Sequence, residues 1–137
     1  MRNTELARDY IRRAAVRLQA VDVLFQAESW ADVVRESQEI VELALKALLR
    51  SVGVDPPRIH DLSAVLDGEA HRLPDDVRAE LETLKGASRD LRRDRELAFY
   101  GAEDLTPSGF YSREDGERAR RYARRTVEIV RPHVASA

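Results

Sequence analysis

The chain has 137 residues, no cysteine and a formal net charge of -2, with 43% hydrophobic and 35% charged residues. This length fits a single domain with one hydrophobic core. The absence of cysteine excludes a disulfide framework, a zinc finger and a cysteine enzyme. The three histidines (His60, His71 and His133) are too far apart in the sequence to form a ligand pair at helical spacing. We therefore expect no metal site and no cofactor.

No stretch of the chain reads as a membrane span or an export signal. It contains no run of about eighteen consecutive apolar residues. Residues 1–5 lead into a charged helical pattern and not into a hydrophobic segment. We therefore expect a cytoplasmic protein without a membrane partner.

Charge is distributed unevenly along the chain. Residues 1–85 carry 12 basic and 16 acidic side chains, whereas residues 86–137 carry 11 basic and 9 acidic ones. The C-terminal third is thus the side that we expect to face an anionic ligand. The excess is modest, so the favoured interpretation is that of solvated helix faces with mixed charge.

The first two helices are predicted from apolar spacing. Apolar residues recur at steps of three and four between Leu6 and Phe25, which predicts a helix of about 22 residues. Ser29 is an N-cap candidate with Asp32 three residues later, and a second helix starts there. This helix carries the widest apolar stripe of the chain and ends before Gly53, so we predict that it is central.

Two further helices follow a proline-containing loop. Pro56 and Pro57 cannot continue the second helix, because proline removes a backbone donor and restricts the residue before it. A short third helix is predicted from His60 to about Gly68. Pro74 suits the first turn of a long fourth helix that extends to the aromatic residues near position 100.

The last part of the chain predicts a loop and a fifth helix. Residues 101–111 contain two glycines and a proline, which indicates a loop. Ser112 and Asp115 repeat the pattern of N-cap and acid, and Pro132 should end or kink the helix that follows. No segment shows the alternation of apolar and polar residues that is typical of a strand. The sequence therefore predicts an all-α fold, a five-helix antiparallel bundle with four long helices and one short third helix, formed by a single domain over residues 1–137.

Several of these segments together resemble the HEPN domain family (higher eukaryotes and prokaryotes nucleotide-binding). The second helix carries an alanine-rich run in which Glu42 and Lys46 stand four residues apart, and His60-Asp61-Leu62 follows after the proline-containing loop. The fourth helix ends in the arginine and aromatic run 95–101, and Tyr111 precedes the acidic start of the last helix. The order and spacing of these motifs over nearly the whole chain carry the resemblance.

The resemblance implies a compact helical bundle, commonly a homodimer, that occurs alone or beside a small nucleotidyltransferase. Many members of the family are metal-independent endoribonucleases, including toxins of toxin-antitoxin pairs. Their signature is an arginine, a polar residue, and a histidine five to seven positions after the arginine. In many of the toxins a tyrosine follows two residues after that histidine.

This chain departs from the signature at the histidine. Counting from Arg93 puts Tyr100 at the tyrosine position but Ala98 at the histidine position, and no count from any arginine within residues 89–95 reaches a histidine. RNA cleavage without metal needs proton transfer near neutral pH. Histidine supplies it, whereas arginine and an unperturbed tyrosine do not. The ribonuclease motif is therefore incomplete.

Five residues are our candidates for binding a nucleotide or RNA: Arg92, Arg93, Arg95, Tyr100 and His60. Arginine can hold phosphate through its forked donors, tyrosine can stack on a base, and His60 could replace the missing imidazole if it approaches the fourth helix. The alternative for each is structural: paired charges along a helix, an aromatic ring that pins a loop, and a histidine bonded locally at a helix start. The sequence leaves open whether Arg93 or Arg95 is the family arginine.

Two other charged groups have a structural interpretation. Glu42 and Lys46 are spaced as a helix-surface ion pair. The last helix carries arginines on several sides, which indicates a solvated surface with no single basic face. These arginines are Arg118, Arg120, Arg121, Arg124 and Arg125.

Three functions remain open at this stage. The first is a binding module without catalysis that recognises a nucleotide, RNA or a partner nucleotidyltransferase near Arg95 and Tyr100. The second is a metal-independent endoribonuclease with a rearranged site of Arg93 or Arg95, Tyr100 and His60. The third is a helical dimerisation adaptor. We expect a homodimer, because the stripe of the second helix is wide for its neighbours within one chain.

Overall fold

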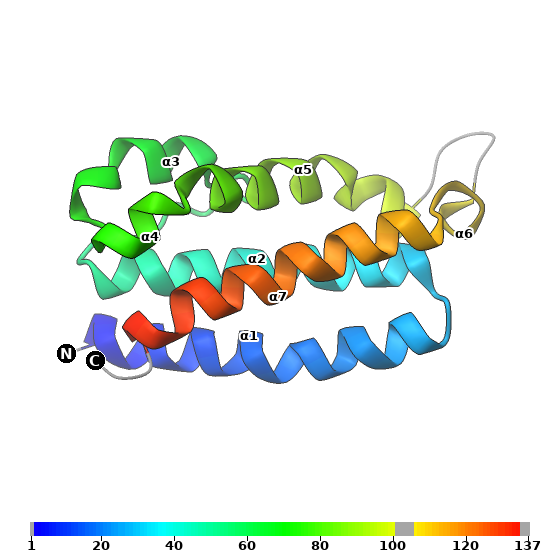
Figure 1. The fold of residues 1–137 in the computed structure, drawn as a ribbon, viewed down its shortest axis with the longest axis horizontal. Helices are drawn as coiled ribbons and strands as arrows, with labels where there is room; N and C mark the ends of the chain where they lie inside the picture. Colours follow the sequence, from blue (N-terminus) through cyan, green and yellow to red (C-terminus); the bar gives the residue numbers. More distant parts are fainter. Residues whose placement is uncertain (1, 101–105, 135–137) are drawn as a thin grey trace.

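The structure is a computed structural model (Figure 1), and it describes residues 2–100 and 106–134. Of residues 2, 92–100 and 107 it describes the backbone alone. In chain order the elements are α1 (Arg2–Gln26), α2 (Trp30–Ser51), α3 (Ser63–Gly68), the 3-10 helix η1 (Ala70–Arg72), α4 (Asp75–Ala79), α5 (Leu81–Tyr100), α6 (Pro107–Phe110) and α7 (Arg113–Val134).

The predicted all-α class and the four long helices are confirmed. The long helices are α1, α2, α5 and α7. The described residues contain no strand, and they form seven α-helices and one 3-10 helix where we expected five helices. None of the helices in this part of the chain is both long enough and apolar enough to cross a bilayer.

The second helix is central, as predicted. α1 and α5 lie on either side of α2, and α7 crosses over it (Figure 1). Its apolar stripe is at most 2% exposed at Val33, Val34, Ile40, Val41, Ala44, Leu45, Ala47, Leu48 and Leu49. One chain therefore covers the stripe by itself, which removes the reason for which we expected a homodimer. The homodimer itself stays a prediction.

The predicted fourth helix is divided into α4 and α5. The division falls at Glu80, whose backbone angles are φ -103° and ψ 14°. Its N–H donates to the Val77 carbonyl at 2.9 Å, and its carbonyl accepts from Leu84 N–H at 3.1 Å, so one helix ends where the next begins. Both Val77 and Leu84 are fully buried. The spacing of apolar residues looked continuous, because a helix break at a single residue does not interrupt apolar positions that recur every three or four residues.

The third helix begins at Ser63 and not at His60. The Asp61 carboxylate accepts hydrogen bonds from the Ser63 N–H at 3.0 Å and from its hydroxyl at 2.7 Å. The buried Leu62 N–H donates to Ser88 Oγ of α5 at 2.8 Å. The residues between α2 and α3 therefore form a loop that contacts α2 through His60 and α5 through Leu62.

Several helix ends follow the sequence signals, but α7 does not end at Pro132 and continues to Val134, and Ser29 precedes α2 without a side-chain cap hydrogen bond. Ser112 N–H donates to Asp115 Oδ2 at 2.8 Å, so the predicted cap of the last helix is confirmed. Gly53 has φ 83°, the left-handed conformation expected after α2. The segment predicted as the loop 101–111 contains the short helix α6 within its described part.

Candidate functional site

A groove lies between α5 and α7. Its volume is about 540 Å³, which is in the range of ligand pockets in proteins. It is lined by Thr83, Arg118, Arg121, Tyr122, Arg124, Arg125 and Glu128. The lining contains four arginines and one glutamate, so the groove presents mainly cationic side chains.

The helical period of α7 gathers these arginines. Positions 118, 121, 125 and 128 follow one another at steps of three or four residues, which puts them along one side of the helix. The other side is buried in the core through Ala119, Ala123, Thr126, Val127 and Val130. Another arginine of the helix, Arg120, lies with its guanidinium carbon 3.7 Å from the centre of the Phe25 ring. The arginines of α7 therefore lie on more than one side, as we expected, and some of them share the groove with α5.

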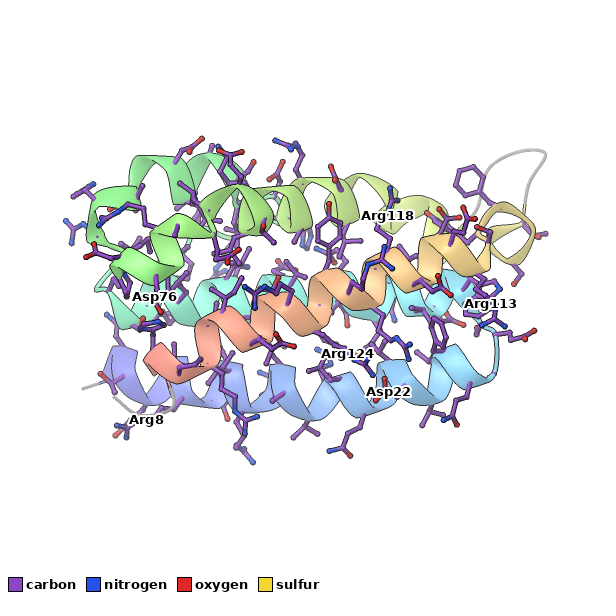
Figure 2. The ribbon with its side chains drawn as sticks, viewed as in Figure 1. Arg8, Asp22, Asp76, Arg113, Arg118 and Arg124 are labelled. Atoms are coloured by element: carbon purple, nitrogen blue, oxygen red, sulfur yellow. The ribbon has the colours of Figure 1, made fainter. Side chains whose placement is uncertain are left out.

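The arginines of the groove differ in their partners. Arg124 Nη2 lies 2.6 Å from Asp22 Oδ1 of α1, a pair that Figure 2 places between the two helices. Arg125 pairs with Glu80 at 2.8 Å and with Glu128 at 3.3 Å. Arg121 is exposed and has no carboxylate partner in the described part of the chain. An exposed ion pair contributes only about 0–1 kcal/mol to stability. An anionic ligand therefore competes with carboxylates that bind these arginines weakly.

A tyrosine forms the apolar part of the groove. Tyr122 donates its hydroxyl hydrogen to Asp90 Oδ2 of α5 at 3.0 Å. Burial, together with the hydrogen bond to the Asp90 carboxylate, raises the pKa of Tyr122 above its ordinary value of 10.0. The phenol therefore stays protonated at neutral pH and does not act as a base. The described residues of this groove can bind an anion, but they include no histidine for proton transfer.

Four of the five predicted site residues lie outside the described side chains. Arg92, Arg93, Arg95 and Tyr100 belong to the C-terminal half of α5, of which only the backbone is described. They follow Asp90, the residue that holds Tyr122 at the groove. Their roles stay predictions.

His60, the fifth candidate, is joined to α2. Its Nδ1 lies 2.9 Å from Glu42 Oε1 and 3.1 Å from Oε2, and Lys46 Nζ donates to the same Oε1 at 3.1 Å. Glu42 and Lys46 are 14% and 21% exposed, so they are not the open surface pair that their spacing predicted. The bond from His60 spans 18 residues of sequence and is not a local helix-start contact. His60 is not among the residues that line the α5/α7 groove.

Sequence reasoning missed the groove arginines as a group. The signal that could have found them is the spacing of Arg118, Arg121 and Arg125 relative to the buried positions of the same helix. We interpreted the arginines of this helix as lying on several sides, and did not separate Arg118, Arg121 and Arg125 from the others. Neither the carboxylate of Asp22 nor that of Glu80 could be matched to α7 from sequence, because both lie far away along the chain.

The comparisons with known proteins agree with this helical architecture. The family model described as HEPN domain matches residues 7–133. No curated protein and no solved structure matches the chain. The matched range begins within α1 and ends one residue before the end of α7, so it includes the central α2, the His60 loop and the arginine groove. A match over nearly the whole chain means that this chain belongs to the HEPN domain family.

Proposed function

We propose that the chain is a nucleotide- or RNA-binding module, and that the groove between α5 and α7 holds phosphate groups. The observation that carries the proposal is the alignment of four arginines along one groove, with Arg121 exposed and lacking a carboxylate partner in the described part of the chain. Guanidinium groups bind phosphate oxygens through two parallel hydrogen bonds. Membership of the HEPN family supports the same ligand class.

The shape and chemistry of the groove favour a polymer over a buried small molecule. Its arginines come from successive turns of one helix and extend along the surface, as the phosphates of a strand do. The Tyr122 ring adds a surface on which a base can stack. Since the sequence lacks the family histidine and the Tyr122 phenol keeps its proton, binding without cleavage is the expected outcome.

The test is the salt dependence of RNA binding. The full chain is titrated with a single-stranded RNA of mixed sequence between about 50 and 200 mM salt. We expect the logarithm of the affinity to fall linearly with the logarithm of salt concentration. For Arg121→Gln the slope should decrease by about 0.7, the amount for one phosphate contact on a single strand.

Arg131→Gln is the matched control. Arg131 is another exposed arginine of α7, but it lines a cavity shared with α1 and lies outside the α5/α7 groove. We expect its salt slope to equal that of the wild type. Equal slopes for all three proteins, or no RNA binding at low salt, would contradict the proposal.

An active ribonuclease is the second candidate function. It is favoured by the Glu42–His60 pair, because a carboxylate that holds Nδ1 leaves Nε2 of the imidazole available for proton transfer. Incubation of the RNA without metal, followed by gel analysis, tests it. Cleavage that is lost both in Arg95→Ala and in His60→Gln would establish this function over simple binding, and intact RNA under all conditions would exclude it.

A dimerisation adaptor is the third candidate, and its observation is an exposed apolar face of α1. Val16 is 56% exposed and Val23 is 66% exposed, and they stand seven residues apart on one helix. Sedimentation of the wild type and of Val23→Arg tests the proposed homodimer. A dimer that becomes monomeric in the variant supports it, whereas a monomeric wild type at high concentration contradicts it. A nucleotidyltransferase partner, as in a toxin-antitoxin pair, is proposed on the family resemblance alone.

A further inference from the structure

A second cationic cavity lies away from the groove, among α1, the end of α2 and the loop after it. Its volume is about 470 Å³. It is lined by Tyr10, Lys46, Arg50, Asp55, Pro56, Pro57 and Arg58, and none of these residues belongs to α5 or α7. This lining contains three cationic side chains and one carboxylate. We refer to it below as the loop pocket.

The single carboxylate of the loop pocket is easily displaced. Asp55 Oδ1 lies 3.5 Å from Arg50 Nη1, and the Asp55 side chain is 87% exposed. An ion pair with one partner in water is worth about 0–1 kcal/mol. Arg58 is exposed and has no acidic partner within the described residues. A stronger anion can therefore replace Asp55 at low cost and meet a second cation at the same time.

Arg50 is held in place and keeps unused donors. Its guanidinium lies 5.6 Å from the centre of the Tyr10 ring, and its Nη1 donates to Asn3 Oδ1 at 3.0 Å. Only 16% of its side chain is exposed. Its Nε is buried and finds no acceptor among the described residues. Buried donors are normally satisfied, so this guanidinium retains hydrogen-bonding capacity that the described residues leave unused.

Glu42 links the loop pocket to His60. One oxygen of Glu42, Oε1, accepts hydrogen bonds from Lys46 Nζ at 3.1 Å and from His60 Nδ1 at 2.9 Å. Lys46 lines the loop pocket and also a neighbouring cavity of about 350 Å³ that shares Tyr10 with it. Leu43 and Glu42 belong to that second cavity. The carboxylate thus fixes a lysine and an imidazole side by side. The adjoining cavity is lined by Tyr10 and Leu43 and by charged side chains, which are Arg13, Arg17, Glu39, Glu42 and Lys46.

We infer that the loop pocket binds the phosphate group of a small phosphate monoester, held by Lys46, Arg50 and Arg58, with the organic part in the adjoining cavity beside Tyr10. A monoester carries more charge on one phosphorus than a diester link of an RNA strand, which suits several cations that converge on one point. Tyr10 of α1, Pro56 and Pro57 line the pocket beside the cations, and its volume of about 470 Å³ suits a small molecule. This site is separate from the proposed function of the α5/α7 groove.

The experiment titrates the full chain with AMP, with glycerol 3-phosphate and with adenosine, followed by calorimetry and by the NMR signals of the His60 ring. We expect AMP to bind, adenosine not to bind, and the His60 signals to move with AMP. Equal affinity for AMP and glycerol 3-phosphate means that the phosphate alone is recognised, whereas tighter AMP binding identifies a nucleotide; both support the site.

Two exposed arginines provide the variant and its control. Arg58→Gln should weaken AMP binding about tenfold, the effect of roughly one charge-assisted hydrogen bond. Arg8→Gln should leave it unchanged, because Arg8 lies on another side of α1 and lines a different cavity (Figure 2). The inference is overturned if AMP does not bind, if adenosine binds as well as AMP, or if Arg58→Gln binds AMP normally. None of these results changes the salt slopes measured with Arg121→Gln, so the two proposals fail separately.

Discussion

The α5/α7 groove and the loop pocket use the same kind of side chain in different ways. The groove takes its arginines from a single helix, and Arg124 and Arg125 are about half exposed, at 45% and 48%. The loop pocket takes its cations from α2 and a loop, and Lys46 and Arg50 are only 21% and 16% exposed. A row of exposed arginines suits the spaced phosphates of a strand, whereas cations that converge from different segments suit one phosphate group.

The two regions also depend on different parts of the fold. The groove exists because α7 packs over α2 and beside α5 (Figure 1). The loop pocket needs α1, α2 and the loop at Asp55–Arg58, with no residue of α7 in its lining. A change that weakens the packing of α7 should therefore reduce binding at the groove more than at the loop pocket. A change in the loop should do the reverse.

The largest effect is expected where Gly116 of α7 packs against the Trp30 side chain of α2. A Cβ at Gly116 would lie 2.7 Å from Cε3 of Trp30, a distance that real side chains do not tolerate. Gly116→Ala should therefore lower the free energy of unfolding by about 1–3 kcal/mol, the usual cost of overpacking. Urea denaturation measures this, and weaker RNA binding at unchanged AMP affinity should accompany it.

Gly86→Ala is the control for that substitution. Gly86 lies in α5, and among the described residues a Cβ there would meet the Tyr122 hydroxyl at the ordinary distance of 3.6 Å. Alanine favours a helix over glycine by about 0.5–1 kcal/mol, so we expect a small gain in stability. A loss at Gly86 as large as at Gly116 would show that the close approach to Trp30 is not the cause.

An intermediate effect is expected at the anchor of the loop. Ser88→Ala removes the acceptor of the buried Leu62 N–H, and an unmet buried donor costs about 1 kcal/mol or more. Stability should fall by about that amount, and AMP binding should weaken while the RNA salt slope stays as it is. Ser63→Ala, which removes a hydroxyl that donates to the Asp61 carboxylate at the start of α3, should cost less. Equal effects of the two substitutions would contradict the role of Ser88.

The smallest effect concerns a contact that belongs to neither region. His133 Nε2 lies 2.8 Å from Asp76 Oδ2, and the hydrogen bond with His133 lowers the pKa of Asp76 below 3.8. Because the pKa of Asp76 is lower in the folded chain than in the unfolded chain, its ionised carboxylate stabilises the fold at pH values above the unfolded pKa. This stabilisation is lost as the pH falls through the pKa of the folded state. Asp76→Asn should therefore have a slightly lower urea midpoint than the wild type at neutral pH. The difference should vanish well below pH 3.8, and both binding activities should be unaffected.

Much of the fold could be predicted because its signals are local. The four long helices, the central position of α2, the Ser112 cap and the left-handed Gly53 all followed from spacings of a few residues. The division at Glu80 and the late start of α3 could not be predicted. Each depends on contacts with other parts of the chain, such as the bond between Leu62 and Ser88.

The candidate sites were predicted less completely. His60 was singled out, but as a substitute for a histidine of the fourth helix and not as the partner of Glu42. Arg92, Arg93, Arg95 and Tyr100 stay predictions from the family resemblance. The arginines of α7 were noticed and set aside, because a list of charges does not say which of them share a groove with another helix.

By itself the sequence determined which segments are helical and which face of each helix is apolar, since both depend on the repeat of about 3.6 residues per turn. Only the tertiary structure decided that Glu42 holds His60 across 18 positions and that Asp22 meets Arg124 across 102. The physical reason is that helix periodicity acts over one or two turns, whereas a binding site is made where distant helices pack, and that packing is set by the whole core at once.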